Sequence, residues 1–407
     1  MADSFSPGTG NLNLPIDPAD LPRETYCVGG WVRDCLLGRQ PLGETREPRP
    51  KVDIDFVLPA GSIDTARQIA RKYKAPFVLL DREREIARVV LPQGNLDFAK
   101  QVGATLLDDL RQRDFCMNAM AVPVHRPGEI IDPHDGIGDL QQKIVRMVSP
   151  ENIAADPLRI LRAYRQAAQL NFTIEPWTHQ TIKQLAPLLP QVAIERIRME
   201  LTYLLQSDSD WLLTCLEDQI FSPWLPSTKL RLDRFCRLAP TIGQILARYP
   251  LQNYFCQAIV NLTLKYAALV PSASMWDFLG LSRQEQKWIT TLLRYLPQLP
   301  SAENSPLEQY YLFSHVGEML PALFALARAD GIPVSDLWLD RWLNPHDPIA
   351  HPATLVTGDD LQQFLAIKPG PRLGQLLIAI REAQILQIVN DREQALEFAK
   401  TWWQSTS

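Results

Sequence analysis

Apolar and polar positions follow two different periods along this chain, and the change from one to the other falls near residue 150. Before it, residues 52–58 alternate between apolar side chains and aspartate, which is the period of a strand with one apolar and one polar face. Other short apolar runs bounded by turn residues predict strands at 26–28, 77–80, 86–91 and 95–99, and a helix at 63–73. After it, apolar residues at helical spacing predict helices at 156–170, 176–189 and 194–205.

This change of period divides the chain into five expected parts. The first is a loosely ordered leader rich in Ser, Gly, Pro, Asn and Asp. A head with a small mixed sheet follows, and then an all-helical neck, body and tail, so we expect an α+β fold class. The expected bounds are 1–20 for the leader, 21–149 for the head, 150–206 for the neck, 207–345 for the body and 346–407 for the tail.

Six cysteines are scattered singly through the 407 residues, with no Cys-x-x-Cys pair. This spacing indicates neither a zinc site nor a disulfide framework, and it favours a reducing, cytoplasmic location. The N-terminal residues lack the basic and apolar regions of a signal peptide, and no run approaches the roughly 18 apolar residues of a membrane span. We therefore expect a soluble protein that is not exported.

The overall charge leaves RNA binding open. A net charge of −5 and an isoelectric point near 5.8 give no compositional sign of a nucleic-acid binder. Contacts with phosphate groups need only local clusters of Lys and Arg, however, and carboxylates at a metal site lower the total charge.

The residues that carry chemistry begin at a glycine pair. Gly29-Gly30-x-x-Arg33 starts a predicted helical turn, and Asp53-x-Asp55 follows on the alternating strand. Glycines allow the backbone to approach a phosphate closely, and a helix N-terminus with an arginine nearby supplies positive potential. Residues i and i+2 of a strand point to the same face, so both aspartates can bind hard cations side by side. That geometry suits two-metal phosphoryl transfer, although each half alone is common as a plain turn or a solvated strand face.

A second candidate lies at the start of the helical part. Asp156, Arg159, Arg162 and Arg165 are each three residues apart, so they form one row along a predicted helix. At a rise of 1.5 Å per residue the row is ~13 to 14 Å long, about the distance from a nucleobase to a terminal phosphate. Such a row can pair with a base edge at one end and hold phosphates at the other. The alternative is a surface helix with ordinary Asp–Arg ion pairs.

Six blocks of the chain follow one another in the order of a known family and cover roughly residues 20–205. They are 28–38, 53–55, 110–121, 132–140, 156–165 and 195–201. In these blocks the sequence resembles the class II tRNA nucleotidyltransferases and bacterial poly(A) polymerases. Beyond them, only 356–361 and 369–374 resemble the family's tail.

The resemblance implies a nucleotidyltransferase head and a template-independent enzyme that adds C, A or both to the 3′ end of tRNA. The substrates would be CTP and/or ATP, with release of pyrophosphate, and the helical parts would hold the acceptor stem. It implies that Asp53 and Asp55 are the catalytic Mg²⁺ ligands, and that Asp156 and Arg159 read the incoming base in place of a template. The other positions implied to bind the nucleotide are Gly30, Arg33, Arg113, Arg162 and Arg165.

The segment between the predicted strand at 95–99 and a helix that begins near Leu106 bears on which nucleotide is added. Only about seven residues separate these two elements. The resemblance implies a longer flexible loop there in full CCA-adding enzymes and its absence in CC-adding members. It therefore favours addition of CC, with A-only addition left open.

Three positions near the resembling blocks leave details open. Ala155 stands where the family usually has Glu, and Gln112 replaces the first Arg of an Arg-Arg-Asp block, which leaves Arg113 as that block's cation. Asp97 is either a third carboxylate near the metal ions or a strand-end residue that faces solvent.

Two rival functions remain. A poly(A) polymerase shares the head and differs in its choice of RNA, but a long basic C-terminal extension is absent here. A non-catalytic RNA-binding protein is the alternative from another class, and clustered carboxylates beside phosphates argue against it. In the body, the basic residues at 229, 231, 234 and 237 either contact a tRNA backbone or form a solvated helix face.

Overall fold

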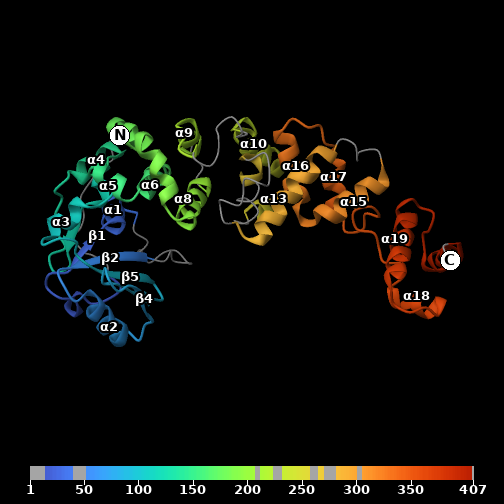
Figure 1. The fold of residues 1–407 in the computed structure, drawn as a ribbon, viewed down its shortest axis with the longest axis horizontal. Helices are drawn as coiled ribbons and strands as arrows, with labels where there is room; N and C mark the ends of the chain where they lie inside the picture. Colours follow the sequence, from blue (N-terminus) through green and yellow to red (C-terminus); the bar gives the residue numbers. More distant parts are fainter. Residues whose placement is uncertain are drawn as a thin grey trace. The chain divides into compact units, whose positions relative to one another are not determined.

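The computed structural model describes residues 14–39, 52–206, 211–222, 232–256, 265–269, 281–299 and 305–405. Internal contacts divide the chain into two compact units, Met1–Trp224 and Leu225–Ser407. Each unit is described by itself (Figure 1).

The first unit contains a six-stranded sheet in the order β3-β4-β5-β2-β1-β6. β2 and β5 run parallel, and the other neighbouring strands run antiparallel, so the sheet is mixed and the expected α+β class is confirmed. The bounds are β1 Tyr26–Val28, β2 Val52–Leu58, β3 Phe77–Asp81, β4 Ile86–Leu91, β5 Gly94–Lys100 and β6 Ala121–Pro123.

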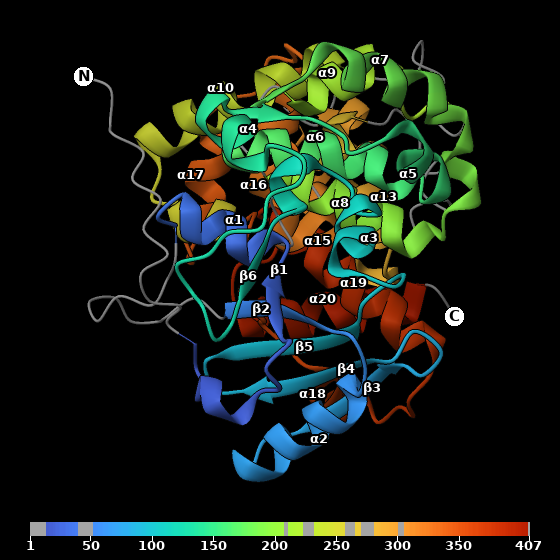
Figure 2. The same cartoon turned by 90° about the vertical axis from the view of Figure 1, so that its left-hand side faces the viewer.

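One face of this sheet is apolar and buried. On β2 the side chains of Ile54 and Phe56 are about 1% exposed or less, and the Phe56 ring stacks on that of Phe98 at a centroid distance of 5.0 Å. Helix α2 (Ser62–Lys72) packs on β3, β4 and β5 through its buried side, as Figure 2 shows. Because strand side chains alternate, this packing directs Asp53 and Asp55 to the opposite face.

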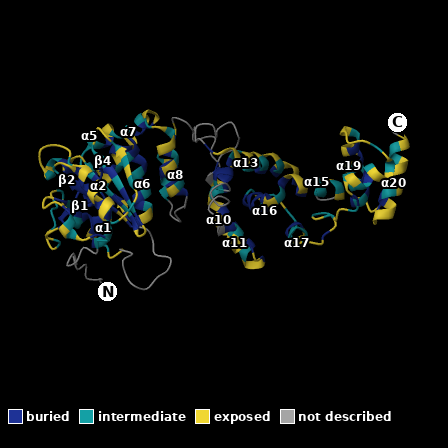
Figure 3. Cartoon of the chain, turned by 90° about the horizontal axis from the view of Figure 1, so that it is seen from below, coloured by how far each residue is buried: buried dark blue, intermediate teal, exposed yellow. Residues whose placement is uncertain are grey.

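Further helices complete the first unit. Figure 3 marks many buried residues on α6, which packs against α8 and α9. Besides α2, the α-helices described in the first unit are α1 Gly30–Leu36, α3 Leu106–Arg111, α4 Gly136–Gln142, α5 Pro150–Ala155, α6 Leu158–Leu170, α7 Pro176–Leu185, α8 Ile194–Gln206 and α9 Trp211–Glu217. Short 3₁₀ helices are η1 Pro18–Asp20, η2 Cys116–Asn118 and η3 Ala186–Gln191, and two short parallel strands are β7 Ile144–Val145 and β8 Thr173–Ile174.

The predicted helix at 156–170 begins later than expected. Asp156 has φ −136° and ψ 90°, so it is extended and links α5 to α6, which starts at Leu158. The reason is Pro157, because the ring of a proline disfavours the helical conformation in the residue before it. Asp156 is therefore not part of one helical row with the three arginines.

Residues 14–20, predicted to be part of a loose leader, are instead packed on the head. Ile16 is 3% exposed, and the amide of Asp17 donates to the Tyr73 hydroxyl at 2.7 Å. The carboxylate of Asp20 accepts from the same hydroxyl at 2.8 Å and pairs with Lys72. Residues 1–13 of the predicted leader lie outside the described residues.

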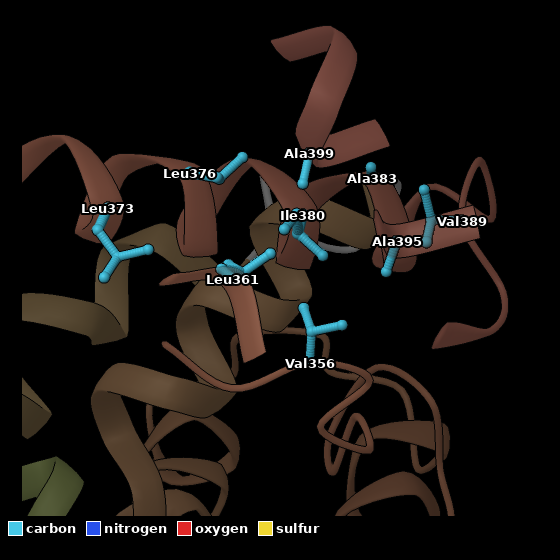
Figure 4. Packing of buried hydrophobic residues seen from close by; sticks show 9 residues of the cluster. All are labelled: Val356, Leu361, Leu373, Leu376, Ile380, Ala383, Val389, Ala395 and Ala399. Carbon is cyan, nitrogen blue, oxygen red and sulfur yellow. The ribbon is translucent and has the colours of Figure 1, made fainter. Parts of the chain in front are cut away.

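Every named secondary-structure element in the described part of the second unit is a helix. Its named helices are α10 Leu232–Arg248, α11 Gln252–Cys256, α13 Arg283–Tyr295, α15 Pro306–Val316, α16 Leu320–Ala329, α17 Leu337–Leu343, α18 Gly358–Leu365, α19 Pro371–Ile385 and α20 Arg392–Ser405, with the 3₁₀ helices η7 Leu296–Gln298 and η8 Gly317–Met319. Figure 4 shows the apolar core that α18, α19 and α20 share, and Trp402 and Trp403 pack against it. Within the described residues, no helix is long and apolar enough to cross a membrane.

The described arginines of the predicted basic face, Arg234 and Arg237, bond to other residues of the second unit. Arg234 is 3% exposed and pairs with Asp330 at 2.5 Å, while Arg237 donates to the Ala329 carbonyl at 2.6 Å. Lys229 and Arg231 lie outside the described residues. Arg234 thus stabilises helix packing, whereas the Arg237 side chain is 53% exposed and also pairs with Asp233 of its own helix.

Candidate active site

Three aspartates share the polar face of the sheet. The register of β2 and β5 sets Asp53 opposite Asn95, and Asp55 opposite Asp97. The Asn95 amide donates to the Asp53 carboxylate at 2.8 Å, which fixes the orientation of that side chain. Asp53 and Asp55 therefore project from one face of one strand, with Asp97 directly beside Asp55.

Asp97 has a cationic partner of its own. Arg88, opposite it on β4, donates through Nε at 2.7 Å and Nη2 at 2.8 Å to its two carboxylate oxygens. This bidentate pair holds Asp97 on the polar face, so the residue is not a solvated strand end. Whether it also serves as a metal ligand stays a prediction.

The carboxylate of Asp55 reaches solvent, yet protein surrounds it closely. This desolvation, opposed by Arg113 and reinforced by Asp97 and Asp53, raises the pKa of Asp55 to about 6. Several carboxylates close together favour a bound cation, because the cation relieves their mutual repulsion.

The turn before α1 is built directly against Asp55. Gly29 has φ 74° and ψ −144°, a conformation that side chains rarely adopt. A Cβ atom at this position would lie 3.2 Å from Asp55 Oδ2 and 3.6 Å from Arg113 Nη1. Gly29 thus allows the turn, the Asp55 carboxylate and the Arg113 guanidinium to come together, although the sequence predicted a nucleotide contact only for its neighbour Gly30.

An open cleft of about 1090 Å³ lies over the same face of the sheet. Its apolar floor consists of Val57, Ala99 and Ile86, which are the next row of the sheet after Asp55, Asp97 and Arg88. Of the predicted site residues, it is lined by Arg113, Asp156 and Arg159. Arg113 therefore links the cleft to the aspartates, because its positive charge also interacts with the Asp55 carboxylate.

The two predicted base-reading residues lie at the cleft wall and do not form a side-chain pair with each other. Asp156 accepts from Arg196 on α8 at 3.0 Å. Arg159 donates to the Gln112 carbonyl at 2.9 Å. Desolvation lowers the pKa of Arg159, although Asp114 and Asp156 oppose the shift. Both side chains line the cleft, and each is held in place by a hydrogen bond to another part of the protein.

The other predicted arginines are held inside the protein. Arg33 donates to Asp34 at 2.8 Å and to Asn118 at 2.9 Å, and its Nη2 would lie 3.4 Å from a Cβ on Gly30. Arg162 donates twice to Asp114, at 2.9 and 2.7 Å.

Arg165 lies on another side of α6. It pairs with the buried Glu200 of α8 at 2.5 Å and donates to Gln169 at 2.7 Å. Its guanidinium also lies 5.8 Å from the centroid of the Tyr203 ring. Arg33 and Arg162 belong to the network around Asn118 and Asp114, whereas Arg165 bonds to Glu200 and Gln169; Glu200 also lies 4.0 Å from Arg162, so the two sets of contacts meet at that carboxylate.

The donor set fits a hard divalent ion. Two aspartate carboxylates face the same space, and oxygen donors of this kind suit Mg²⁺ and similar ions, which take their other ligands from substrate phosphates. Within the described ranges, no group of three or more His, Cys, Asp or Glu side chains converges as a complete metal site. The residues therefore fit a metal site that substrate completes.

Comparisons with known proteins agree with this architecture. The family model described as "Poly A polymerase head domain" matches residues 25–146. The model described as "Probable RNA and SrmB- binding site of polymerase A" matches 171–231, and "tRNA nucleotidyltransferase domain 2 putative" matches 244–399.

Similar whole proteins are nucleotidyltransferases. The CC-adding tRNA nucleotidyltransferase of Synechocystis sp. is 40% identical over 406 residues, with 95% of each chain covered. The A-adding tRNA nucleotidyltransferase of Deinococcus radiodurans is 30% identical over 450 residues, with 96% of this chain and 98% of the relative covered. The Thermotoga maritima CCA-adding enzyme complexed with tRNA has a similar fold, with a TM-score of 0.67 at 22% identity over 93% of this chain and 91% of that one.

A mixed sheet that presents paired aspartates beside a glycine turn, with helices following it, defines a nucleotidyltransferase. Together with the relatives, this identifies the chain as a member of the tRNA nucleotidyltransferase and poly(A) polymerase family, which confirms the resemblance found in the sequence. It belongs to a family of enzymes, and nucleotidyl transfer in general depends on divalent metal ions.

Proposed function

We propose that this protein adds C residues from CTP to the 3′ end of tRNA, as a CC-adding tRNA nucleotidyltransferase that uses Mg²⁺. The observation that carries the proposal is the placement of Asp53 and Asp55 on one face of β2, against Gly29 and Arg113. A 40% identity to a CC-adding enzyme over 95% of the chain supports the choice of reaction.

In this mechanism the chain's own residues mainly position charges. Bound Mg²⁺ would activate the terminal ribose hydroxyl of the tRNA and neutralise the triphosphate. Asp53 and Asp55 would hold the ions, and Arg113 would place positive charge beside the phosphates. Asp156 and Arg159, fixed at the cleft wall, would pair with the edge of the incoming base. Positioning and charge neutralisation account for most of the rate in phosphoryl transfer, so this protein needs no covalent intermediate.

The segment between β5 and α3 supports a restricted nucleotide choice. It spans only residues 101–105, and the Val102 amide donates to the buried Asp109 carboxylate at 3.0 Å. The Gln101 amide donates to the Ala104 carbonyl at 2.9 Å. This short, internally bonded segment occupies the place where the family resemblance implies a long flexible loop in full CCA-adding enzymes. We therefore favour CC addition over the complete sequence CCA.

The test is an extension assay on three tRNA substrates, ending in the discriminator base, in C or in CC, each with CTP or ATP alone. CC addition predicts that CTP extends the first by two nucleotides and the second by one, and that ATP does not extend the third. Extension of only the CC-ended tRNA by ATP would instead identify A addition, the activity named for the Deinococcus relative.

The same assay separates the rival functions. Long A tails on unrelated RNA would identify a poly(A) polymerase, and no extension of any substrate would favour a non-catalytic RNA-binding protein. A cytoplasmic location remains part of the proposal, and the absence of a disulfide at Cys27, Cys116, Cys215 and Cys236, among the described cysteines, agrees with a reducing compartment.

A further inference from the structure

Gln166 is an exception on the buried side of α6. The other buried residues of this helix, apart from the hydroxyl of Tyr164, are apolar, whereas Gln166 carries an amide and is only 3% exposed. A buried polar group costs free energy unless it is hydrogen-bonded, so its partners indicate why it is there.

The partners of Gln166 belong to the head. Its Oε1 accepts from Asn118 Nδ2 at 3.0 Å and from Arg33 Nη1 at 3.3 Å. Asn118 Oδ1 accepts from the same arginine nitrogen at 2.9 Å. Arg33 is the residue whose guanidinium lies beside the Gly30 backbone at the glycine turn. Gln166 thus connects α6 to the turn that adjoins Asp55.

The network continues to Arg162 on the same helix. Asn118 Nδ2 also donates to Asp114 at 3.0 Å, and Asp114 accepts both hydrogen bonds of Arg162. Asp114 is itself buried; desolvation opposes its ionisation, but Arg162 and Asn118 outweigh that effect and lower the pKa of Asp114 to about 2. The hydrogen bonds to the ionised Asp114 carboxylate fix the positions of its partners, because each partner restricts the orientation of the others.

Arg159, Arg162 and Gln166 form one stripe on α6, at positions i, i+3 and i+7. They contact the segment that carries Arg113 in order, at the Gln112 carbonyl, the Asp114 carboxylate and the Asn118 side chain. The helix that carries Arg159 is therefore aligned along this segment at three points, and Gln166 is the point that also reaches Arg33.

We propose that Gln166 is a positioning residue for the nucleotide, which holds Arg33 at the glycine turn in a fixed relation to Arg159 and Arg162 on α6. Resting on the proposed function, this assigns Arg33 to the triphosphate and the α6 stripe to the nucleoside. Gln166 acts through Arg33 and touches no substrate itself. Its hydrogen bonds to Arg33 and Asn118 keep the two ends of the nucleotide site at a fixed position relative to each other.

The experiment measures equilibrium binding of CTP with Mg²⁺ and, separately, of tRNA, for the full-length wild type and Gln166→Met. Methionine fills a similar volume and removes the acceptor oxygen. We expect the Kd for CTP to rise about tenfold, which corresponds to about 1.4 kcal/mol, while the Kd for tRNA stays within about twofold. Gln141→Met, at an exposed position on α4, is the matched control and should leave both values unchanged.

A cycle with Arg33→Lys tests the route of the effect. If Gln166 acts through Arg33, the loss of CTP affinity on adding Gln166→Met to Arg33→Lys should be at least threefold smaller than in the wild type. Additive losses, an unchanged Kd for CTP in Gln166→Met, or an equal weakening of tRNA binding would each overturn the proposal. Should Gln166→Met not fold, as judged by its thermal transition, Gln166→Asn withdraws the amide by one methylene and carries the same expectation.

The binding measurement also keeps the two proposals apart. A wild type that binds CTP but extends no tRNA would refute the proposed function, while the Kd values would still decide the role of Gln166. A wild type that binds neither CTP nor ATP would refute both.

Discussion

Replacement of Gly29 by alanine tests whether the glycine turn exists to let the Asp55 carboxylate approach the backbone. At φ 74° and ψ −144°, a Cβ introduces backbone strain of about 1–3 kcal/mol. For a unit of this size, that corresponds to a fall in Tm of roughly 2–12 °C. The Cβ would also lie 3.2 Å from Asp55 Oδ2, which is closer than nearly all such contacts, so the carboxylate must move by a few tenths of an ångström.

The displacement of Asp55 should be visible in catalysis separately from stability. Because a misplacement of about 1 Å can cost a hundredfold in rate, we expect kcat for nucleotide addition to fall roughly tenfold to a hundredfold in Gly29→Ala. Single-turnover extension of tRNA at saturating CTP, measured well below the Tm of the variant, reports this rate directly. Circular dichroism on heating gives the stability.

Gly61→Ala is the matched control. Gly61 also has a positive φ, 72°, but nothing lies within 4 Å of its would-be Cβ. Because Gly61 has ψ 23° and lies in the left-handed helical region, which other residues can adopt at a lower cost, Gly61→Ala should show a smaller fall in Tm, with kcat unchanged. If both variants lost the same activity, or if Gly29→Ala kept its kcat, the contact between the turn and Asp55 would not matter to catalysis and the reasoning would be refuted.

The remaining predictions concern single side chains and the metal. Asp55→Asn should lower kcat more than about a hundredfold, since loss of even an outer partner of a metal site costs about 10–100-fold; full activity in that variant would contradict the site. Chelation with EDTA should abolish extension and excess Mg²⁺ restore it, and an enzyme indifferent to EDTA would rule out metal dependence. Asp109→Asn should lower stability by about 1–3 kcal/mol, measured by urea unfolding, because it leaves Arg113, whose side chain is 26% exposed, without its ion pair; an unchanged stability would contradict this. Burial alone would raise the pKa of Asp114, but Arg162 and Asn118 outweigh burial and lower this pKa to about 2, below its unfolded value of about 3.8. Its ionisation thus contributes about 2–3 kcal/mol above pH 4, and this contribution is lost as the pH falls toward 2. The stability difference between wild type and Asp114→Asn should shrink over that range, and a constant difference would show that the ion pair is not the cause.

The head could be predicted from the sequence wherever the signal is local. Strict alternation over residues 52–58 predicted β2 with both aspartates on one face, and the structure has a strand at those same residues. What local patterns could not supply is the partner across the sheet. That Asp97 lies opposite Asp55 depends on the parallel pairing of β2 with β5, which the alternation of either strand leaves undetermined.

The row of charged residues shows a second limit. A spacing of three predicted that Arg165 would continue the line of Arg159 and Arg162, but steps of about 100° per residue rotate a position three residues on by about −60° each time. Seven residues on, the offset is only about −20°, so Gln166 follows Arg159 on the face toward the head. Arg165 turns to Glu200 instead. The charge of the arginines made them candidates in the sequence. Gln166 is uncharged and gave no such signal, because its role depends on burial and on partners that only the structure shows.

The short segment 101–105 and the arginine of the site are connected through one carboxylate. Asp109 is 5% exposed; it accepts from the Val102 amide at 3.0 Å and from Arg113 Nη2 at 2.8 Å. The proposed CC addition selects one base throughout, whereas addition of CCA would require the site to accept a second base. Here the segment next to the cleft is short, and Asp109 ties it to the same cation that adjoins Asp55. Movement of the segment would therefore disturb Arg113, and this restraint is the structural argument for the proposed CC addition.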